Sequence, residues 1–139
     1  MFMDAGSDEL ERVIKLSGLS ALVSERGLDF DCGEGGCNLS GGERQRISIA
    51  RTLLRNSSVL LADEFTAALD AETSYNVSSS ILALDNMTRI VVTHDLDKKL
   101  LEQYDCIITM KQGGIVESGS FESLMDQKGY FYSLFTVAQ

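Results

Sequence analysis

Apolar positions near the start of the chain recur with the period of an amphipathic helix. Within residues 8–17 the apolar side chains lie three and four residues apart, which predicts a helix that ends near Gly18. A second helix is predicted from Ser40 to residue 55, because Ser40 and Glu43 form an S-x-x-E capping box before an apolar stripe. The stripe consists of Ile47, Ala50 and Leu54, with Leu53 beside it. The outer face is expected to carry Arg44, Arg46, Arg51 and Arg55.

Two short apolar runs predict buried strands, and a third pattern predicts a hairpin. Residues 59–62 and 89–93 are largely apolar, as a strand covered on both faces would be. Residues 106–110 and 115–117 flank a glycine turn at 112–114, which predicts a strand and a returning strand. Further helices are predicted over residues 70–84, with Asp70 as the cap, and over 95–103, 121–126 and 130–137. Because helices alternate with strands, the predicted fold class is α/β, with a mainly parallel sheet and flanking helices.

Size and composition limit the classes of protein that the chain can represent. With 139 residues, 44% of them apolar, and a mean hydropathy of +0.01, it suits one globular domain. No run of 18 apolar residues occurs, so no membrane-spanning helix is predicted. A net charge of -9 and a pI near 4.5 disfavour nonspecific binding to nucleic acid. The three cysteines lack C-x-x-C spacing, which argues against a zinc site or a disulfide framework.

A glycine-rich segment precedes the second predicted helix. Five glycines fall within residues 33–42, which indicates unusual backbone dihedrals or close approach to the backbone. Ser40, Gly41 and Gly42 open the helix, where free N–H groups and the positive end of the helix dipole form an anion site. An ordinary capped helix would explain the same residues, since the capping box alone satisfies the helix start.

Polar residues with chemical potential follow both predicted parallel strands. Asp63 and Glu64 would leave the first strand at the carboxyl edge of the sheet, where open α/β sheets bind ligands. One carboxylate could hold a hydrated Mg²⁺ while the other faces a water molecule, because neighbouring side chains of an extended segment point in opposite directions. A solvated turn is the alternative interpretation. His94 ends the second strand, so we expect the two polar sites to meet at one edge of the sheet.

Four short motifs follow one another along the chain. They are Leu39-Ser40-Gly41-Gly42-Glu43-Arg44-Gln45-Arg46, Val59-Leu60-Leu61-Ala62-Asp63-Glu64, Ala68-Leu69-Asp70 and Thr93-His94-Asp95. In this order they closely resemble the signature, the Walker B strand, the D-loop and the switch-histidine loop of the ATP-binding cassette (ABC) ATPases. The resemblance runs from about residue 8 to the end of the chain, and it implies a partial P-loop NTPase fold.

The resemblance implies a role for each candidate site residue. Asp63 is similar to the Walker B acid on the Mg²⁺ side, acting through water, and Glu64 to the acid that orients or deprotonates the attacking water. His94 is similar to the switch that contacts the γ-phosphate, and Asp70 to the D-loop acid that links two sites across a dimer. The signature residues implied to contact the nucleotide bound by a partner cassette are Ser40, Gly41, Gly42 and Glu43. Such groups suit phosphoryl transfer, which depends on positioning and charge stabilisation.

Within the family, the resemblance is to exporters. Residues 33–35 are similar to the loop through which exporters sense their membrane domain, and residues 114–120 and 129–134 to an exporter tail. The implied partners are transmembrane domains and a second cassette, at the cytoplasmic face of a membrane. Two features depart from this subtype: Thr93-His94-Asp95 is closer to importers, and Phe65 replaces the small residue or proline that usually follows the Walker B glutamate.

The phosphate loop of the family, G-x-x-x-x-G-K-[ST], is absent, because no lysine in the chain precedes a serine or threonine. The glutamine loop and the adenine-stacking aromatic residue are absent too. We therefore expect the C-terminal portion of a cassette, either a truncated gene product, a shortened chain or half of a split protein. Residues 1–57 would end the helical subdomain, and residues 58–139 would belong to the core. ATP and Mg²⁺ are the implied cofactors, and both would need the missing half.

The absence of the first half of a cassette leads to a prediction of how the chain behaves alone. In this family the strand before the phosphate loop lies between the strands that resemble residues 89–93 and 106–110. Without that strand both neighbours would expose an unpaired edge, so we expect the chain to self-associate and to be inactive alone. Two other functions stay open: a non-enzymatic half-cassette that regulates full cassettes, and the C-terminal lobe of a chromosome-maintenance ATPase.

Overall fold

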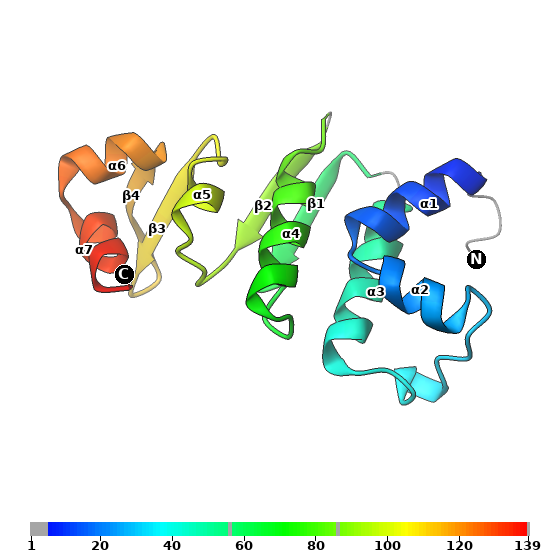
Figure 1. Ribbon diagram of the computed structural model, residues 1–139. Helices are drawn as coiled ribbons and strands as arrows, with labels where there is room; N and C mark the ends of the chain where they lie inside the picture. Colours follow the sequence, from blue (N-terminus) through cyan, green and yellow to red (C-terminus); the bar gives the residue numbers. More distant parts are fainter. Residues whose placement is uncertain (1–5, 56, 86, 139) are drawn as a thin grey trace. The chain divides into compact units, whose positions relative to one another are not determined.

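The computed structural model describes residues 6–55, 57–85 and 87–138 (Figure 1). The chain divides into two compact units, one ending at Thr93 and one beginning at His94. The predicted division at residue 57 rests on the family resemblance and stays a prediction. In the described residues, no helix is both long enough and apolar enough to cross a membrane.

The first unit combines helices with one pair of strands. Its described elements are α1 (Ser7–Leu16), α2 (Ser20–Arg26), a 3₁₀ turn (Glu34–Gly36), α3 (Gly41–Leu53), β1 (Val59–Asp63), α4 (Ala71–Leu82) and β2 (Thr88–Val92). The predicted helices at residues 8–17 and 70–84 and both predicted strands are confirmed within a few residues. Helix α2 was not predicted, because it is only seven residues long and no side chain caps its start.

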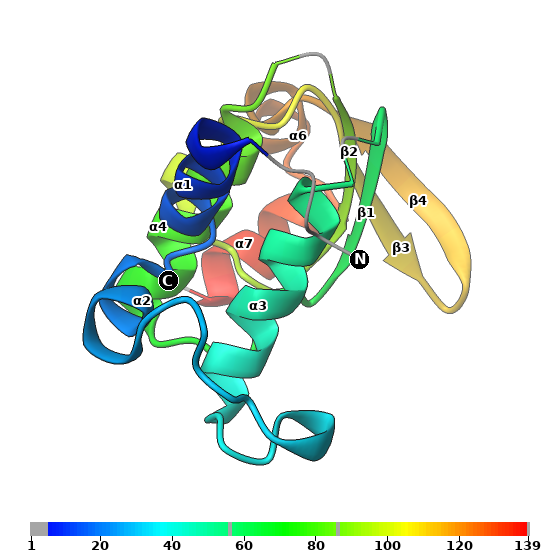
Figure 2. The same cartoon turned by 90° about the vertical axis from the view of Figure 1, so that its right-hand side faces the viewer.

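Strands β1 and β2 form a parallel pair, with Leu61 opposite Ile90 and Asp63 opposite Val92. One face of β1 is covered, since Leu60 and Ala62 pack with residues of α1, α3 and α4 in the hydrophobic core of this unit. Figures 1 and 2 show α4 running beside this strand pair. The opposite face is open: Leu61 is 72% exposed and Ile90 is 55% exposed. The prediction of strands buried on both faces is therefore wrong for the described residues, because those helices cover only one face.

The predicted start of the signature helix is confirmed. Ser40 is the N-cap of α3, its Oγ accepts a hydrogen bond from the N–H of Glu43, and the Glu43 carboxylate accepts one from the N–H of Ser40. The apolar face of the helix buries Ile49, Ala50 and Leu53.

The arginines of α3 do not all lie on its outer face. Arg44, Arg51 and Arg55 are exposed, as expected, but Arg46 is half-buried and its Nε atom lies inside the unit. Its side chain packs against Gly18, where an added Cβ would lie 3.3 Å from Arg46 Cδ. The prediction for Arg46 fails because the turn after α1 covers this position.

The glycine-rich segment uses its glycines as expected. Gly33, Gly35 and Gly36 have φ values of +73°, +61° and +76°, which side-chain-bearing residues rarely adopt. An added Cβ at Gly33 would lie 2.5 Å from Cys37 Sγ, so the turn also needs the space that glycine leaves.

The second unit contains an antiparallel hairpin and three helices among its described residues. They are α5 (Lys98–Leu101), β3 (Ile107–Lys111), β4 (Gly114–Gly119), α6 (Phe121–Gln127) and α7 (Tyr130–Ala138). The predicted hairpin and both C-terminal helices are confirmed. The helix predicted over 95–103 is shorter, because Asp97 caps its start by accepting a hydrogen bond from the N–H of Leu100.

An aromatic cluster forms the core of the second unit. Phe121, Phe131 and Phe135 are buried with Leu101 and Leu124, and the rings of Phe121 and Phe135 meet edge to face at 5.3 Å. The fold is thus mixed α/β, as predicted. The described strands form one parallel and one antiparallel pair, so the sheet content is mixed rather than mainly parallel.

Candidate functional site

The acidic pair lies where β1 ends, beside the end of β2. The N–H of Glu64 donates to the carbonyl of Val92 at 2.9 Å, so the parallel pairing continues one residue beyond β1. Asp63 and Glu64 are both exposed, which leaves their carboxylates accessible to a ligand. The expectation that the two strands end at one edge is confirmed, whereas the expected meeting of His94 with the acidic pair at that edge stays a prediction.

Glu64 has an unusual backbone conformation. Its φ of +43° lies in the left-handed region, which non-glycine residues adopt at a cost of about 1–3 kcal/mol. Its carbonyl accepts hydrogen bonds from the N–H of Ala67 at 3.0 Å and from Gln45 Nε2 at 3.2 Å. The chain therefore turns sharply at Glu64, immediately after the strand, and the surrounding hydrogen bonds hold the turn.

The carboxylates at this edge could bind Mg²⁺ only together with ligands from outside the chain. Within the described residues, no group of three acidic, histidine or cysteine side chains could enclose a metal ion. Mg²⁺ is commonly held by one or two carboxylates together with water and substrate phosphates. A single exposed carboxylate such as Asp63 fits that mode, with the remaining ligands coming from outside the chain.

The predicted signature residues lie together at the start of α3. Ser40 and Glu43 close the capping box, and Glu43 also contacts Arg26 at 3.5 Å. The hydrogen bond from the Ser40 backbone lowers the pKa of the Glu43 carboxyl below its usual value. Gly41 and Gly42 occupy the first helical positions, whose N–H groups have no acceptor within the helix. The structure thus combines an ordinary helix cap with N–H groups that have no acceptor within the helix, so the capped-helix interpretation and the anion-site interpretation are compatible.

Asp70 has a structural function of its own. It is the N-cap of α4, and its Oδ1 accepts a hydrogen bond from the N–H of Thr73 at 2.9 Å, which lowers the pKa of its carboxyl. Arg46 adds a smaller favourable charge. His94, by contrast, is the first residue of the second unit and is exposed.

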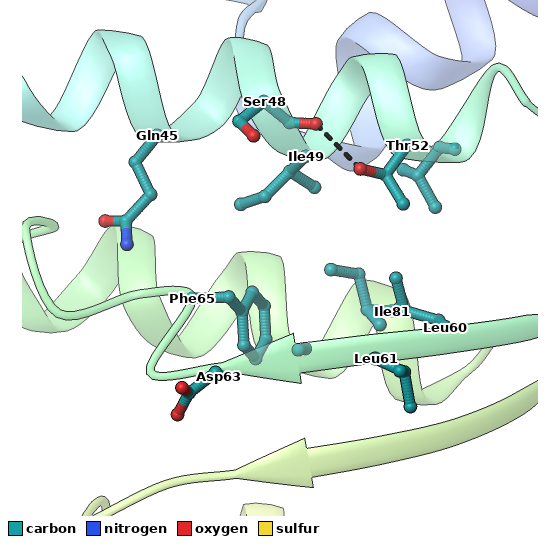
Figure 3. Close-up of a pocket in the computed structure, with 11 residues that line it drawn as sticks. Gln45, Ser48, Ile49, Thr52, Leu60, Leu61, Asp63, Phe65 and Ile81 are labelled. Carbon is teal, nitrogen blue, oxygen red and sulfur yellow. Dashed lines mark hydrogen bonds between the residues drawn. The ribbon is translucent and has the colours of Figure 1, made fainter.

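A hollow of about 250 Å³ lies between α3 and β1, lined by side chains of both elements (Figure 3). Gln45 and Asp63 line it together with Phe65, whose half-buried ring packs against the core. Phe65, a departure from the family pattern, thus anchors the loop that follows β1. Gln45 is a site residue that sequence reasoning missed, although it lies inside the recognised motif.

Comparisons with known proteins match this arrangement. The family profile described as "ABC transporter" matches residues 7–67, which include the helix start and the acidic pair. A solved structure titled "Structure of a bacterial Atm1-family ABC exporter with ATP bound" superposes with a TM-score of 0.83 at 32% identity, over 98% of this chain and 24% of that one. The chain belongs to the ABC transporter family.

Its similarity is to the ATPase domain of exporters within that family. The ATP-dependent lipid A-core flippase of Haemophilus ducreyi is 46% identical over 114 residues, which are 81% of this chain and 19% of the flippase. The flippase of the same description from Neisseria meningitidis is 41% identical over 138 residues, 97% of this chain. The chain spans about 22% of the length of the latter relative, so it corresponds to part of a much longer transporter.

Proposed function

We propose that the chain supplies the signature and the hydrolytic carboxylate of an ABC exporter's ATPase domain. The observation that carries the proposal is the position of Asp63 and Glu64 at the end of β1. They lie beside the end of β2, and Gln45 of α3 donates a hydrogen bond to the Glu64 carbonyl. Exporter relatives cover nearly the whole chain, which supports this assignment over a chromosome-maintenance ATPase.

The chemistry follows from the charges that the site presents. ATP hydrolysis requires a water molecule aligned with the γ-phosphate and cations that offset the developing negative charge. Glu64 would orient or deprotonate that water, and Asp63 would hold Mg²⁺ through its hydration shell. Mg²⁺, when bound, supplies charge stabilisation to the phosphate oxygens.

The remaining site residues would act at the edges of the nucleotide. The N–H groups of Gly41 and Gly42, with the Ser40 hydroxyl, would contact the γ-phosphate held by a partner cassette. Glu43, whose carboxylate closes the capping box, would hold this signature segment in place beside that nucleotide. Asp70 would connect the two sites across that dimer, and His94 would contact the γ-phosphate from the loop after β2. ATP binding would need a phosphate loop, which this sequence lacks.

The proposed partners are the transmembrane domains of an exporter and a second cassette, which would hold the chain at the cytoplasmic face of a membrane. The names of the relatives mention different transported molecules. They are lipid A-core for the flippases and β-(1→2)glucan for the exporter of Bartonella bacilliformis. Similarity in this segment therefore does not select a transported substrate.

A hybrid exporter tests the proposal. The chain would replace the matching segment of the Haemophilus ducreyi flippase, and ATP turnover would be measured with Glu64→Gln and with Glu11→Gln as the matched control. Glu11 is an exposed glutamate of α1. Loss of the general base should lower turnover by about 10²–10⁴-fold, and the control should leave it unchanged. Near-normal turnover of the Glu64→Gln hybrid would refute the role of Glu64.

A further inference from the structure

One glutamine side chain holds both ends of the loop that follows β1. Gln45 lies on α3, and its Nε2 donates to the carbonyl of Glu64 at 3.2 Å. Its Oε1 accepts a hydrogen bond from the N–H of Ala68 at 3.0 Å. Figure 3 shows the Gln45 side chain reaching from the helix toward this loop. Both bonds join residues about 20 positions apart in the sequence, so they fix tertiary structure rather than a local turn.

The start of α3 packs against the same loop. A Cβ added to Gly42 would lie 3.0 Å from the carbonyl oxygen of Ala68, so the helix and the loop backbone approach as closely as a glycine permits. At Gly41 the nearest atom is Ala68 Cβ at 3.9 Å. The signature end of the helix and the loop are therefore in direct contact, and Gln45 adds the directional bonds.

Glu64 depends on its hydrogen-bond partners more than an ordinary residue does. With φ at +43°, its backbone would relax elsewhere unless neighbouring groups held it. Its N–H is fixed to β2 and its carbonyl is shared between Ala67 and Gln45. Of these partners, Gln45 is the one that joins Glu64 to the signature helix.

We propose that Gln45 is a positioning residue for Glu64, which couples the signature end of α3 to the hydrolytic carboxylate within one chain. The proposal rests on the proposed role of Glu64. A displacement of the helix start would shift Glu64 and Ala68 together, since one rigid amide bridges them. The carboxylate would then take its hydrolytic position only while α3 holds its place.

Hydrogen exchange on the 139-residue chain tests the bridge without any activity. In Gln45→Ala the Ala68 amide loses its acceptor, so it should exchange about fivefold faster, the equivalent of about 1 kcal/mol. The Ile81 amide inside α4 should keep its rate, whereas a general loss of stability would accelerate both. Gln45→Glu retains an acceptor oxygen and should leave Ala68 protected. Gln127→Ala, an exposed glutamine of α6, is the matched control.

Kinetics of the hybrid exporter test the consequence for Glu64. Gln45→Ala and Gln45→Glu both lose the donor to the Glu64 carbonyl, so kcat should fall about tenfold while KM for ATP stays unchanged. Gln127→Ala should change neither constant. An unchanged kcat in both Gln45 variants would overturn the positioning role.

The two experiments separate failure of this proposal from failure of the proposed function. If the Ala68 amide exchanges at the wild-type rate in Gln45→Ala, the bridge is overturned, whatever turnover the hybrid exporter shows. If Glu64→Gln leaves turnover of the hybrid intact, the proposed function fails, and the positioning role fails with it even if exchange confirms the bridge. If Glu64→Gln abolishes turnover while both Gln45 variants retain it, only the positioning role fails.

Discussion

The four acidic residues of the candidate site fall into two groups that the sequence motif alone does not separate. Glu43 and Asp70 accept hydrogen bonds from N–H groups at helix starts, and those bonds lower the pKa of both carboxyls. Asp63 and Glu64 instead leave the end of a strand and are exposed. The first group stabilises helix starts, and the second is the pair for which we propose a role in ATP hydrolysis.

The lowered pKa of Asp70 predicts a pH dependence of stability. A carboxyl with a pKa below its ordinary value of 3.8 contributes stability that is complete above that value and is lost as the pH falls below it. Asparagine caps helices about as well as aspartate but does not titrate in this range. In Asp70→Asn the loss of unfolding free energy on acidification below about pH 4 should therefore be smaller than in the wild type.

Urea unfolding followed by circular dichroism over pH 2–6 measures this difference. Asp85→Asn, at an exposed aspartate after α4, is the control. It should lose the same unfolding free energy on acidification as the wild type. Identical pH profiles for the wild type and Asp70→Asn would contradict the assignment of the cap.

Local signals predicted the caps but not the bridge. Ser40 with Glu43 and Asp70 before α4 act within three residues of themselves, so their function is visible in sequence spacing. Gln45 acts on Glu64 and Ala68 through tertiary contacts, and no local spacing encodes such a contact. Its place in the recognised motif was the only available signal.

At the scale of elements, periodicity located most helices and strands but misjudged strand burial. The run at 59–62 is apolar throughout, which is typical of a strand covered on both faces, yet Leu61 is exposed while Leu60 is buried. A sequence pattern reports what a strand can bury and not which elements lie nearby to cover it.

One strand side chain caps a helix in the second unit, and it predicts a measurable loss of stability. The Glu117 carboxylate on β4 accepts hydrogen bonds from the N–H groups of Tyr130 and Phe131 at 2.6 and 2.7 Å. Glu117→Ala leaves these part-buried donors unsatisfied, so the free energy of unfolding should fall by about 1–3 kcal/mol.

Chemical denaturation of Glu117→Ala and Glu102→Ala measures the effect of this cap. Glu102 forms an exposed ion pair with Lys98, and such a pair typically contributes about 0–1 kcal/mol. A loss no larger in Glu117→Ala than in Glu102→Ala would show that the strand does not stabilise α7.

At the scale of the whole molecule, open strand edges and faces predict self-association. In the described residues β2 pairs only with β1, and β3 pairs only with β4. Ile90 and Ile108 on these strands are 55% and 57% exposed. Unpaired edges with apolar side chains favour pairing with another chain.

Sedimentation velocity at micromolar concentration should therefore detect oligomers of the isolated chain. Ile90→Lys should reduce them, because a charged side chain on an edge strand opposes pairing. Val137→Lys is the control, since Val137 is 89% exposed but lies on α7. A stable, ordered wild-type monomer would count against self-association.

The central claim is that this chain carries the hydrolytic carboxylate and the signature of an ABC exporter ATPase but not the loop that holds the phosphates. Steady-state hydrolysis of Mg²⁺-ATP by the isolated chain tests it most directly. No turnover is expected, because Asp63 and Glu64 would have no phosphate positioned before them. Turnover by the isolated chain that Glu64→Gln abolishes would contradict the account.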